Sequence, residues 1–197
     1  MREDEVLYWE EVASGRTRNI TDNIWKRQEI VRRMLKIPWY KTNILEIGVG
    51  IGNAIAAIQC ITLGNFKYIG TDLSSTFCKN LKRMWGLNAV QTDILTLPPG
   101  KFDRVIALDS LEHVKPEDRV QGYLQIKDRL AEHATMLINM PLSETQHDLR
   151  YDHSFTMEDI QEICMVTGLH VDYAERYSIY IPTSARTINY RWVVLQK

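Results

Sequence analysis

The sequence predicts a doubly wound α/β fold, in which a mostly parallel sheet ends in an antiparallel hairpin at one edge. Between residues 43 and 168, short apolar segments alternate with segments of helical periodicity, as in parallel βαβ units. Glycines or acidic residues follow the first four apolar segments. The last two extended segments are joined only by Pro182–Arg186, and such a short connection favours antiparallel neighbours.

Residues 1–40 are expected to be helical and to cap the core. A short helix is expected over residues 5–13, and a second helix should begin at the N-cap Thr21 and end before Pro38. Apolar residues recur in the second helix at helical spacing, so we expect them on or beside its inner face. These residues are Ile24, Ile30, Val31, Met34 and Leu35.

The core elements are expected in alternation. Strands are expected over Asn43–Ile47, Lys67–Thr71, Asn88–Gln91, Phe102–Leu108 and Ala134–Met140. Helices are expected over Asn53–Leu63, Ser75–Trp85 and Pro116–Leu130. After a loop over Pro141–Phe155, Thr156 should open a helix with Asp159 as its capping-box partner, and Gly168 should end it. The final strands are expected over Leu169–Ile181 and Thr187–Gln196.

Length and composition indicate one globular domain over residues 1–197, with a cap over 1–40 and a core over 43–197. The net charge of -1 gives no broad basic field, so a nucleic-acid partner is not expected. Three scattered cysteines favour reduced thiols in the cytoplasm, with no metal site. No signal peptide is expected, and no apolar run has the length of a membrane span. The sequence does not indicate an oligomeric state.

Three glycines follow the first predicted strand, in the segment Glu46-Ile47-Gly48-Val49-Gly50-Ile51-Gly52-Asn53. Glycines permit tight turns and let a ligand lie against bare backbone. The next helix would point its first N–H groups at that ligand. The spacing Gly-x-Gly-x-Gly disfavours a pyrophosphate loop, which uses Gly-x-Gly-x-x-Gly. The alternative is a plain tight turn between strand and helix.

Acidic residues follow the next two predicted strands. Asp72 lies 20 residues after Gly52, where a carboxylate can accept both hydroxyls of an adenosine ribose. Its alternative role is a helix N-cap. Asp93 can accept from an adenine amino group while Ile94 packs on the ring or offers its N–H, although Asp93 is also a plausible turn residue before Pro98.

Four segments together resemble the ordered motifs of the class I S-adenosylmethionine-dependent methyltransferases: Glu46–Asn53, Thr71–Ser74, Thr92–Ile94 and Phe102–Val114. The segment His153–Asp159, followed by Gly168-Leu169, is most similar to the ubiquinone-biosynthesis-like branch, whose members mostly methylate small molecules. The resemblance covers residues 43–197. It implies a Rossmann-like seven-stranded sheet of order 3-2-1-4-5-7-6 with strand 7 antiparallel, and S-adenosylmethionine as the cofactor.

The resemblance also implies the contacts with this methyl donor. Glycines of the first motif lie under the methionine part, acids and apolar residues of the next two hold the adenosine, and the fourth motif lies near the methionine amino group. The implied donor-binding residues are Glu46, Gly48, Gly50, Gly52, Asp72, Leu73, Asp93, Ile94, Asp109, Ser110 and Leu111.

A general base is needed only if the methyl acceptor carries a proton at neutral pH, and histidine suits that range. The candidates are His113, His147 and His153, with His113 first because it follows the fourth strand. The alternatives are a histidine in a first helical turn and two solvated loop residues.

Residues of the N-terminal segment are candidates for a lid over the acceptor. Tyr8, Trp9 and Trp25 are the aromatic candidates, although Trp25 is expected to pack between helix and sheet. Arg16 and Arg18 are either contacts for an acidic ligand group or solvated charges.

Three functional classes fit these motifs. The first is methyl transfer to an oxygen, nitrogen or carbon atom of a small molecule. The second is a protein or nucleic-acid methyltransferase, which is disfavoured for nucleic-acid amines because Asp109-Ser110-Leu111-Glu112 lacks their Asn/Asp-Pro-Pro-aromatic loop. The third is a non-catalytic relative that binds the donor. The spacing of the glycines and the presence of Asp93 disfavour a nicotinamide dinucleotide.

Overall fold

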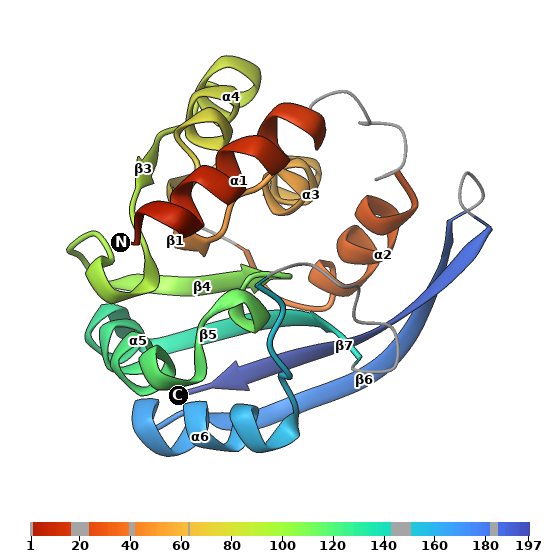
Figure 1. Ribbon diagram of the computed structural model, residues 1–197. Helices are drawn as coiled ribbons and strands as arrows, with labels where there is room; N and C mark the ends of the chain where they lie inside the picture. The colour runs from red at the N-terminus through yellow and green to blue at the C-terminus, as the bar shows by residue number, and fades with distance from the viewer. Residues whose placement is uncertain (1, 17–23, 40–41, 63, 143–150, 182–184) are drawn as a thin grey trace.

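Seven strands form one sheet with helices on both faces (Figure 1). The computed structural model describes residues 2–16, 24–39, 42–62, 64–142, 151–181 and 185–197. The strand order is β3-β2-β1-β4-β5-β7-β6. The first five strands are mutually parallel, and β7 runs antiparallel to both β5 and β6. The predicted fold class, strand order and antiparallel strand 7 are therefore confirmed.

The elements alternate in chain order as expected. The strands are β1 Thr42–Ile47, β2 Phe66–Asp72, β3 Ala89–Gln91, β4 Phe102–Leu108, β5 Leu130–Pro141, β6 His170–Ile181 and β7 Arg186–Gln196. The helices are α1 Glu3–Arg16, α2 Ile24–Met34, α3 Asn53–Thr62, α4 Ser75–Trp85, α5 Pro116–Arg129 and α6 Met157–Thr167. Two short 3₁₀ turns, η2 Ile94–Thr96 and η3 Leu111–His113, follow β3 and β4.

One boundary of the core differs from the expected one by several residues. Strand β5 begins at Leu130, directly after α5, and not at Ala134. Leu130 pairs with Phe102 at the start of β4, and the register then shifts through a bulge before the regular ladder. The sequence of this stretch lacks the apolar alternation of a strand, so tertiary pairing extends β5 beyond the pattern.

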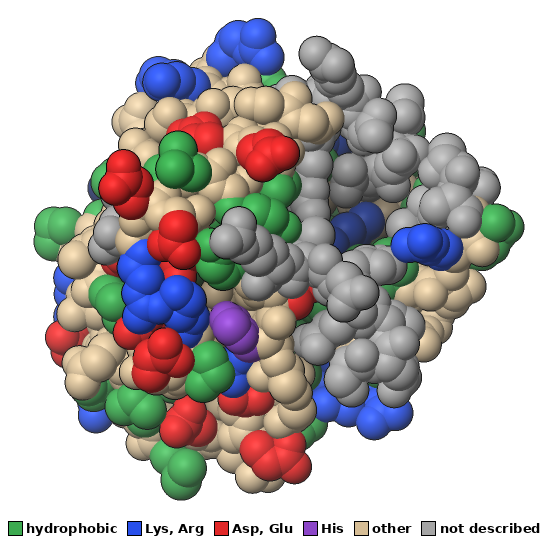
Figure 2. Space-filling model, in the orientation of Figure 1, with side chains coloured by type: hydrophobic (Ala, Val, Ile, Leu, Met, Phe, Trp, Pro, Cys, Tyr) green, Lys and Arg blue, Asp and Glu red, His purple; other side chains and the backbone are tan. Residues whose placement is uncertain are grey.

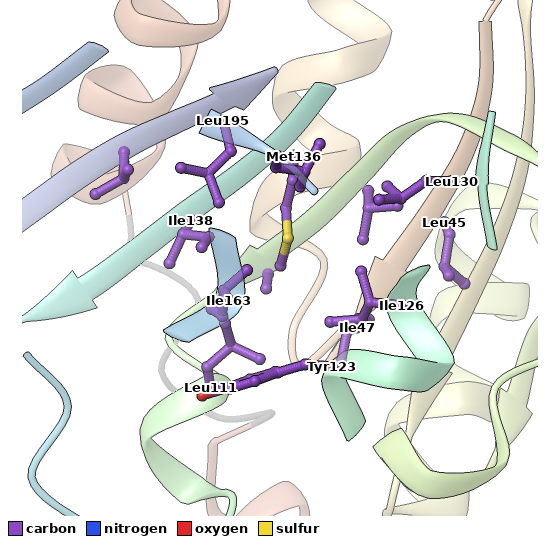
Figure 3. Packing of buried hydrophobic residues seen from close by; sticks show 14 of the residues in the cluster. Leu45, Ile47, Leu111, Tyr123, Ile126, Leu130, Met136, Ile138, Ile163 and Leu195 are labelled. Atoms are coloured by element: carbon purple, nitrogen blue, oxygen red, sulfur yellow. The ribbon is translucent and has the colours of Figure 1, made fainter. Parts of the chain in front are cut away.

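Two apolar layers fill the space between the sheet and its helices. On one face, Leu45 and Ile47 of β1 belong to the same cluster as Tyr123 of α5 and Ile163 of α6 (Figure 3). On the other face, Ile44 of β1 belongs to the cluster that also contains buried residues of α1, α2, α3 and α4. Strand β1 is therefore buried on both faces, as a central parallel strand requires.

The N-terminal helices pack on the sheet differently from the expected pattern. In α2, Ile30 and Met34 are buried together with Arg33, whereas Ile24 is 47% exposed and Leu35, directly after the helix, is 63% exposed. The inner face of α2 is therefore rotated toward Arg33, whose charge is neutralised by ion pairs described below. The expected packing of Trp25 is also wrong, because this side chain is 49% exposed.

The predicted N-cap Thr21 lies outside the described residues, as does Arg18. Among the described helices, none is both long and apolar enough to span a lipid bilayer.

Candidate functional site

A cavity of about 570 Å³ opens at the carboxyl ends of β1, β2, β3 and β4. This rim is where open α/β sheets bind ligands, and the volume lies within the usual range for ligand pockets. The cavity brings together most of the residues predicted from the sequence. The predicted residues that line it are Glu46, Gly48, Gly50, Asp72, Leu73, Asp93, Ile94, Asp109, Ser110, Trp9 and His113.

The glycine loop after β1 needs its glycines for two different reasons. Gly48 has φ +74°, and a Cβ there would lie 2.7 Å from the Cβ of Ser110, so the loop and the end of β4 touch. Gly50 has φ +46°, and a Cβ on it would meet nothing within 4 Å. Gly48 therefore permits close packing, whereas Gly50 leaves bare backbone beside open space, as a bound ligand requires.

Gly52 and Leu111 are the two predicted donor-binding residues that do not line the cavity. A Cβ at Gly52 would lie 2.9 Å from Nε1 of Trp85, so this glycine accommodates an indole of α4. Leu111 is 2% exposed and belongs to the core cluster of Tyr123 (Figure 3). Their positions support a packing role and not a contact with the donor.

Asp72 is not the N-cap of α4, because Ser74 takes that role and its hydroxyl accepts from the N–H of Phe77. The Asp72 carboxylate accepts from the N–H of Gly50 and the N–H of Ser74, each at 2.9 Å. These bonds tie the carboxylate to the glycine loop at the cavity wall. Burial raises the pKa of Asp72 to about 6, against the opposing effect of the two amide bonds.

Glu46, in β1 just before the glycine loop, is an acidic residue that is only 2% exposed. The hydroxyl of Tyr68 donates to it at 2.5 Å. Burial raises the pKa of Glu46 to about 8, although the bond from Tyr68 opposes this, and the charge of Asp72 adds to the rise. Glu46 is therefore mainly protonated at neutral pH.

Asp93 both lines the cavity and caps the turn η2. Its Oδ1 accepts from the N–H of Leu95 at 3.1 Å and from the hydroxyl of Thr96 at 2.9 Å. The turn role considered from the sequence is therefore present, and it fixes the carboxyl beside Ile94 on the wall.

The end of β4 carries a short polar network. Asp109 has φ +50°, an uncommon conformation for a residue with a side chain. Its N–H donates to the carbonyl of Asn139 at 2.8 Å, and its Oδ1 accepts from Nδ2 of Asn139 at 2.6 Å. Lys26 of α2 forms an ion pair with Oδ2 of Asp109 and also lines the cavity.

The three candidate histidines occupy different positions. His113 lines the cavity, and its Nδ1 lies 2.8 Å from Oδ1 of Asp152, which lines the cavity too. His153 does not line the cavity, but its backbone N–H donates to the backbone carbonyl of Glu112 at 2.8 Å. Burial lowers the pKa of His153, and Arg119 lowers it further. His147 lies outside the described residues.

Helix α1 forms a wall of the cavity and is held by contacts near its start and at its middle. Near its start, Arg2 pairs with Asp118 at 2.9 Å and Glu5 pairs with Lys115 at 2.6 Å. Acidic and basic side chains accordingly lie side by side on this face (Figure 2). Farther along, Glu10 accepts from the N–H of Ser75 at 2.5 Å, at the beginning of α4.

The aromatic residues of α1 form part of this wall. Trp9 is 9% exposed, and its ring centroid lies 4.6 Å from that of His113. Tyr8 packs edge-on against Trp9 and against Tyr151, with centroid distances of 5.1 and 5.0 Å. Trp9 therefore lines the cavity and Tyr8 packs behind it, and a lid over the acceptor stays a prediction. Nothing is described of the side chain of Arg16.

Sequence reasoning missed Lys26 and Asp152. Both lie outside the strand ends that carry the motifs, and their partners are 83 and 39 residues away along the chain. The sequence did offer one signal for Asp152, which directly precedes the candidate base His153. Within the described part of the chain, no cluster of three or more His, Cys, Asp or Glu side chains is arranged to hold a metal.

The comparisons with known proteins support the same region. Residues 44–133 match the family model of a methyltransferase domain. The search of curated protein sequences returned no significant match. The matched segment covers a little less than half of the chain, and it contains all four strand-end motifs.

Solved structures share the fold at low sequence identity. A 1,6-didemethyltoxoflavin-N1-methyltransferase from Burkholderia thailandensis, with its substrate and S-adenosylhomocysteine bound, has a TM-score of 0.71 and 19% identity, and the match covers 98% of this chain and 88% of that one. An S-adenosylmethionine-dependent methyltransferase from Methanosarcina mazei has a TM-score of 0.67 and 15% identity, with 84% and 96% covered. The magnesium protoporphyrin IX methyltransferase of Synechocystis, with S-adenosylmethionine bound, has a TM-score of 0.64 and 14% identity, with 88% and 80% covered.

Proposed function

We propose that this chain is an S-adenosylmethionine-dependent methyltransferase that transfers the methyl group to a small molecule. The observation that carries the proposal is that all four strand-end motifs line one cavity, together with a histidine paired to a carboxylate. The methyltransferase-domain match over residues 44–133 and the ligands of the similar structures support the same cofactor. In the toxoflavin and protoporphyrin enzymes the named substrates are small molecules.

The cavity residues fit the donor in polarity and in space. Each carboxylate oxygen of Asp72 accepts one backbone N–H, from Gly50 or from Ser74. Each oxygen therefore keeps a second lone pair that can accept a ribose hydroxyl. Gly50 offers backbone without a side chain, and the buried hydroxyl of Ser110 has no hydrogen-bond partner among the described residues. Asp93 and Ile94 line the part of the cavity where the adenine ring of the donor would lie.

Bound S-adenosylmethionine supplies an electrophilic methyl group on a sulfonium ion. The protein's own contribution is to orient the acceptor in line with that methyl and to exclude water, which accounts for large rate effects in such transfers. Trp9 and the segment around His113 form the cavity wall from which the acceptor would approach.

His113 is the proposed base for an acceptor that carries a proton. The Oδ1 atom of Asp152 lies 2.8 Å from Nδ1 of His113, so its carboxylate can hold the orientation of the ring. Asp152 is thus a positioning residue. His153 and His147 remain secondary candidates, since His153 does not line the cavity.

We further propose that the protein belongs to the ubiquinone-biosynthesis-like branch and is divided into a cap over 1–40 and a core over 43–197. We also propose that it is located in the cytoplasm and has no nucleic-acid partner. The scattered free thiols and the balanced net charge support the last two.

Calorimetric titration with S-adenosylmethionine, S-adenosylhomocysteine and NAD tests the proposal. We expect both sulfur ligands to bind and NAD to bind far more weakly or not at all. Failure of both sulfur ligands to bind, or a preference for NAD, would refute it.

A further inference from the structure

We infer that Glu112 is a substrate-binding residue whose carboxylate accepts a hydrogen bond from a nitrogen atom of the methyl acceptor. The acceptor is accordingly an amine or another N–H compound, and the methyl group is transferred to its nitrogen. The inference rests on the proposed function and deepens it, because that function leaves the methylated atom open.

The turn η3, which follows β4, places Glu112 at the cavity. Just before this turn, Ser110 lies so close to the glycine loop that no Cβ would fit at Gly48. The next residue, Leu111, is buried in the core cluster and so anchors the turn to the sheet. Glu112 therefore lies two residues beyond the contact with the glycine loop, near the place where a donor bound along that loop would present its methyl group.

Backbone hydrogen bonds hold this turn in place. The N–H of His113 donates to the carbonyl of Ser110 at 3.2 Å, and the carbonyl of Glu112 accepts from the N–H of His153 at 2.8 Å. These bonds involve the backbone of Glu112 and not its carboxyl group. The direction of the side chain is thus set by the protein, while its oxygens are left for a ligand.

The carboxyl group of Glu112 is buried without a hydrogen-bonding partner in the described part of the chain. Glu112 is 2% exposed, and its Oε2 is buried and accepts no hydrogen bond from the described residues. Burial raises the pKa of Glu112, whereas the charges of His113 and Lys26 lower it. A buried carboxylate without a partner is costly, so an N–H group of a ligand that pairs with Glu112 offsets part of this cost.

The charges along the cavity favour an N–H acceptor over an anionic one. The described Lys and Arg residues that line the cavity are Arg2, Lys26 and Lys115, and each forms an ion pair with a carboxylate. An anionic acceptor beside Glu112 would therefore meet a like charge, while the nearby cations already face acids of their own. An amine supplies both the missing hydrogen-bond donor and an opposite charge.

Methyl transfer to nitrogen also moves charge in the direction that Glu112 stabilises. The lone pair of the nitrogen forms the new N–C bond as the C–S bond breaks, and the electrons of that bond remain on sulfur. The positive charge thereby passes from sulfur to nitrogen, where the carboxylate of Glu112 stabilises it. The new ammonium then gives a proton to His113, the proposed base. An oxygen nucleophile would instead react as an anion, which the carboxylate disfavours.

Three probes that share one ring test the inference by titration of the protein saturated with S-adenosylhomocysteine. Benzylamine carries an ammonium group, benzyl alcohol a neutral hydroxyl and benzoate an anion. We expect benzylamine to bind most tightly. Glu112→Gln should weaken benzylamine binding about 10- to 100-fold, as for a lost hydrogen bond between charged groups, and leave the affinity for benzyl alcohol unchanged.

Glu117→Gln is the matched control, because it removes an acidic charge from the first turn of α5. The side chain of Glu117 is 64% exposed and does not line the cavity, so this variant should bind all three probes as the wild type does. Thermal unfolding without ligand separates a binding role from a structural one. Because Glu112→Gln removes a buried charge without a partner, it should unfold at the same temperature as the wild type or at a higher one.

The outcomes distinguish this inference from the proposed function. Absent or equal binding of benzylamine relative to benzyl alcohol, an unchanged preference in Glu112→Gln, or a lower unfolding temperature of that variant would overturn the role of Glu112. A loss of affinity for S-adenosylmethionine but not for S-adenosylhomocysteine in Glu112→Gln would overturn it too, since the carboxylate would then face the sulfonium. If the wild-type protein bound neither sulfur ligand, the proposed function itself would fail.

Discussion

Replacing Asp72 by alanine tests the adenosine end of the donor site. In the proposed complex the carboxylate accepts two ribose hydroxyls, and each such bond is worth roughly 1 to 1.5 kcal/mol net. The loss is therefore about 2–3 kcal/mol, which corresponds to an affinity about 30- to 160-fold lower. The fold should survive, because the N–H of Gly50 lies at the cavity wall, where water can replace the carboxylate, and a costly buried charge is removed. Only the buried N–H of Ser74 is left without a partner.

Calorimetry with S-adenosylhomocysteine measures this loss, and thermal unfolding without ligand measures stability. Asp103→Ala is the matched control, because Asp103 also accepts a backbone N–H, from Asn43 at 2.8 Å, but lies at the start of β4 and away from the cavity. Normal affinity of Asp72→Ala combined with a lower unfolding temperature would show that Asp72 serves only to hold the loop, and the ribose assignment would be refuted.

The pH dependence of binding gives a second measurement on the same group. Because burial raises the pKa of Asp72 to about 6, the carboxyl is ionised at pH 7 and mainly protonated at pH 5. Protonation removes acceptor positions, so wild-type affinity should be about tenfold lower at pH 5 than at pH 7. Asp72→Ala should not show this pH step.

Four further variants test other parts of the site. For Glu46, whose pKa is raised from 4.5 to about 8 by burial, the folded state retains a proton that the unfolded state releases, so stability falls as pH rises from 4.5 to 8. This rise in pKa corresponds to at most about 5 kcal/mol of stability. Glu46→Gln should flatten the fall in stability when chemical denaturation is measured at pH 5, 7 and 9, and an unchanged slope would contradict the raised pKa. Gly48→Ala should lower stability by about 1 kcal/mol or more in the same assay, because φ is +74° and Ser110 occupies the space, and a wild-type melting curve would contradict this packing. With an acceptor that carries a proton, His113→Ala should cut turnover by about 10²- to 10⁴-fold and leave donor affinity unchanged, and Asp152→Asn should cut it less, whereas normal turnover in both would rule out this base.

The fold and the donor side of the cavity were predictable because their signals are local. Each parallel strand contributes an apolar run followed at once by a turn, so a glycine or an acid after the run marks the carboxyl end of the sheet. Asp72 and Asp93 could be placed at one rim without knowledge of any contact. Their hydrogen bonds to Gly50 and Leu95 show that the same residues also hold the turns in which they lie.

The packing of the cap was less predictable, because periodicity shows that a helix has an apolar side but does not show how wide it is. In α2 the buried face is centred on Arg33, between Ile30 and Met34. A buried arginine breaks the apolar pattern. Glu29, one turn earlier in α2, supplies one partner for Arg33, at 2.5 Å. Glu175 and Tyr177 of β6 add a second carboxylate and an aromatic face, so the burial of Arg33 also depends on residues more than 140 positions away.

The same reasoning explains why contacts made by the cap and by the segment before α6 were harder to predict than contacts at the strand ends. Donor contacts come from consecutive strand ends, whose spacing is set by the βαβ repeat, but the partner of His113 comes from the segment before α6 and that of Asp109 from α2. No repeat sets those spacings, since each depends on how a cap or loop closes over the sheet. A pair such as Lys26 and Asp109 is therefore constrained by the three-dimensional cavity alone.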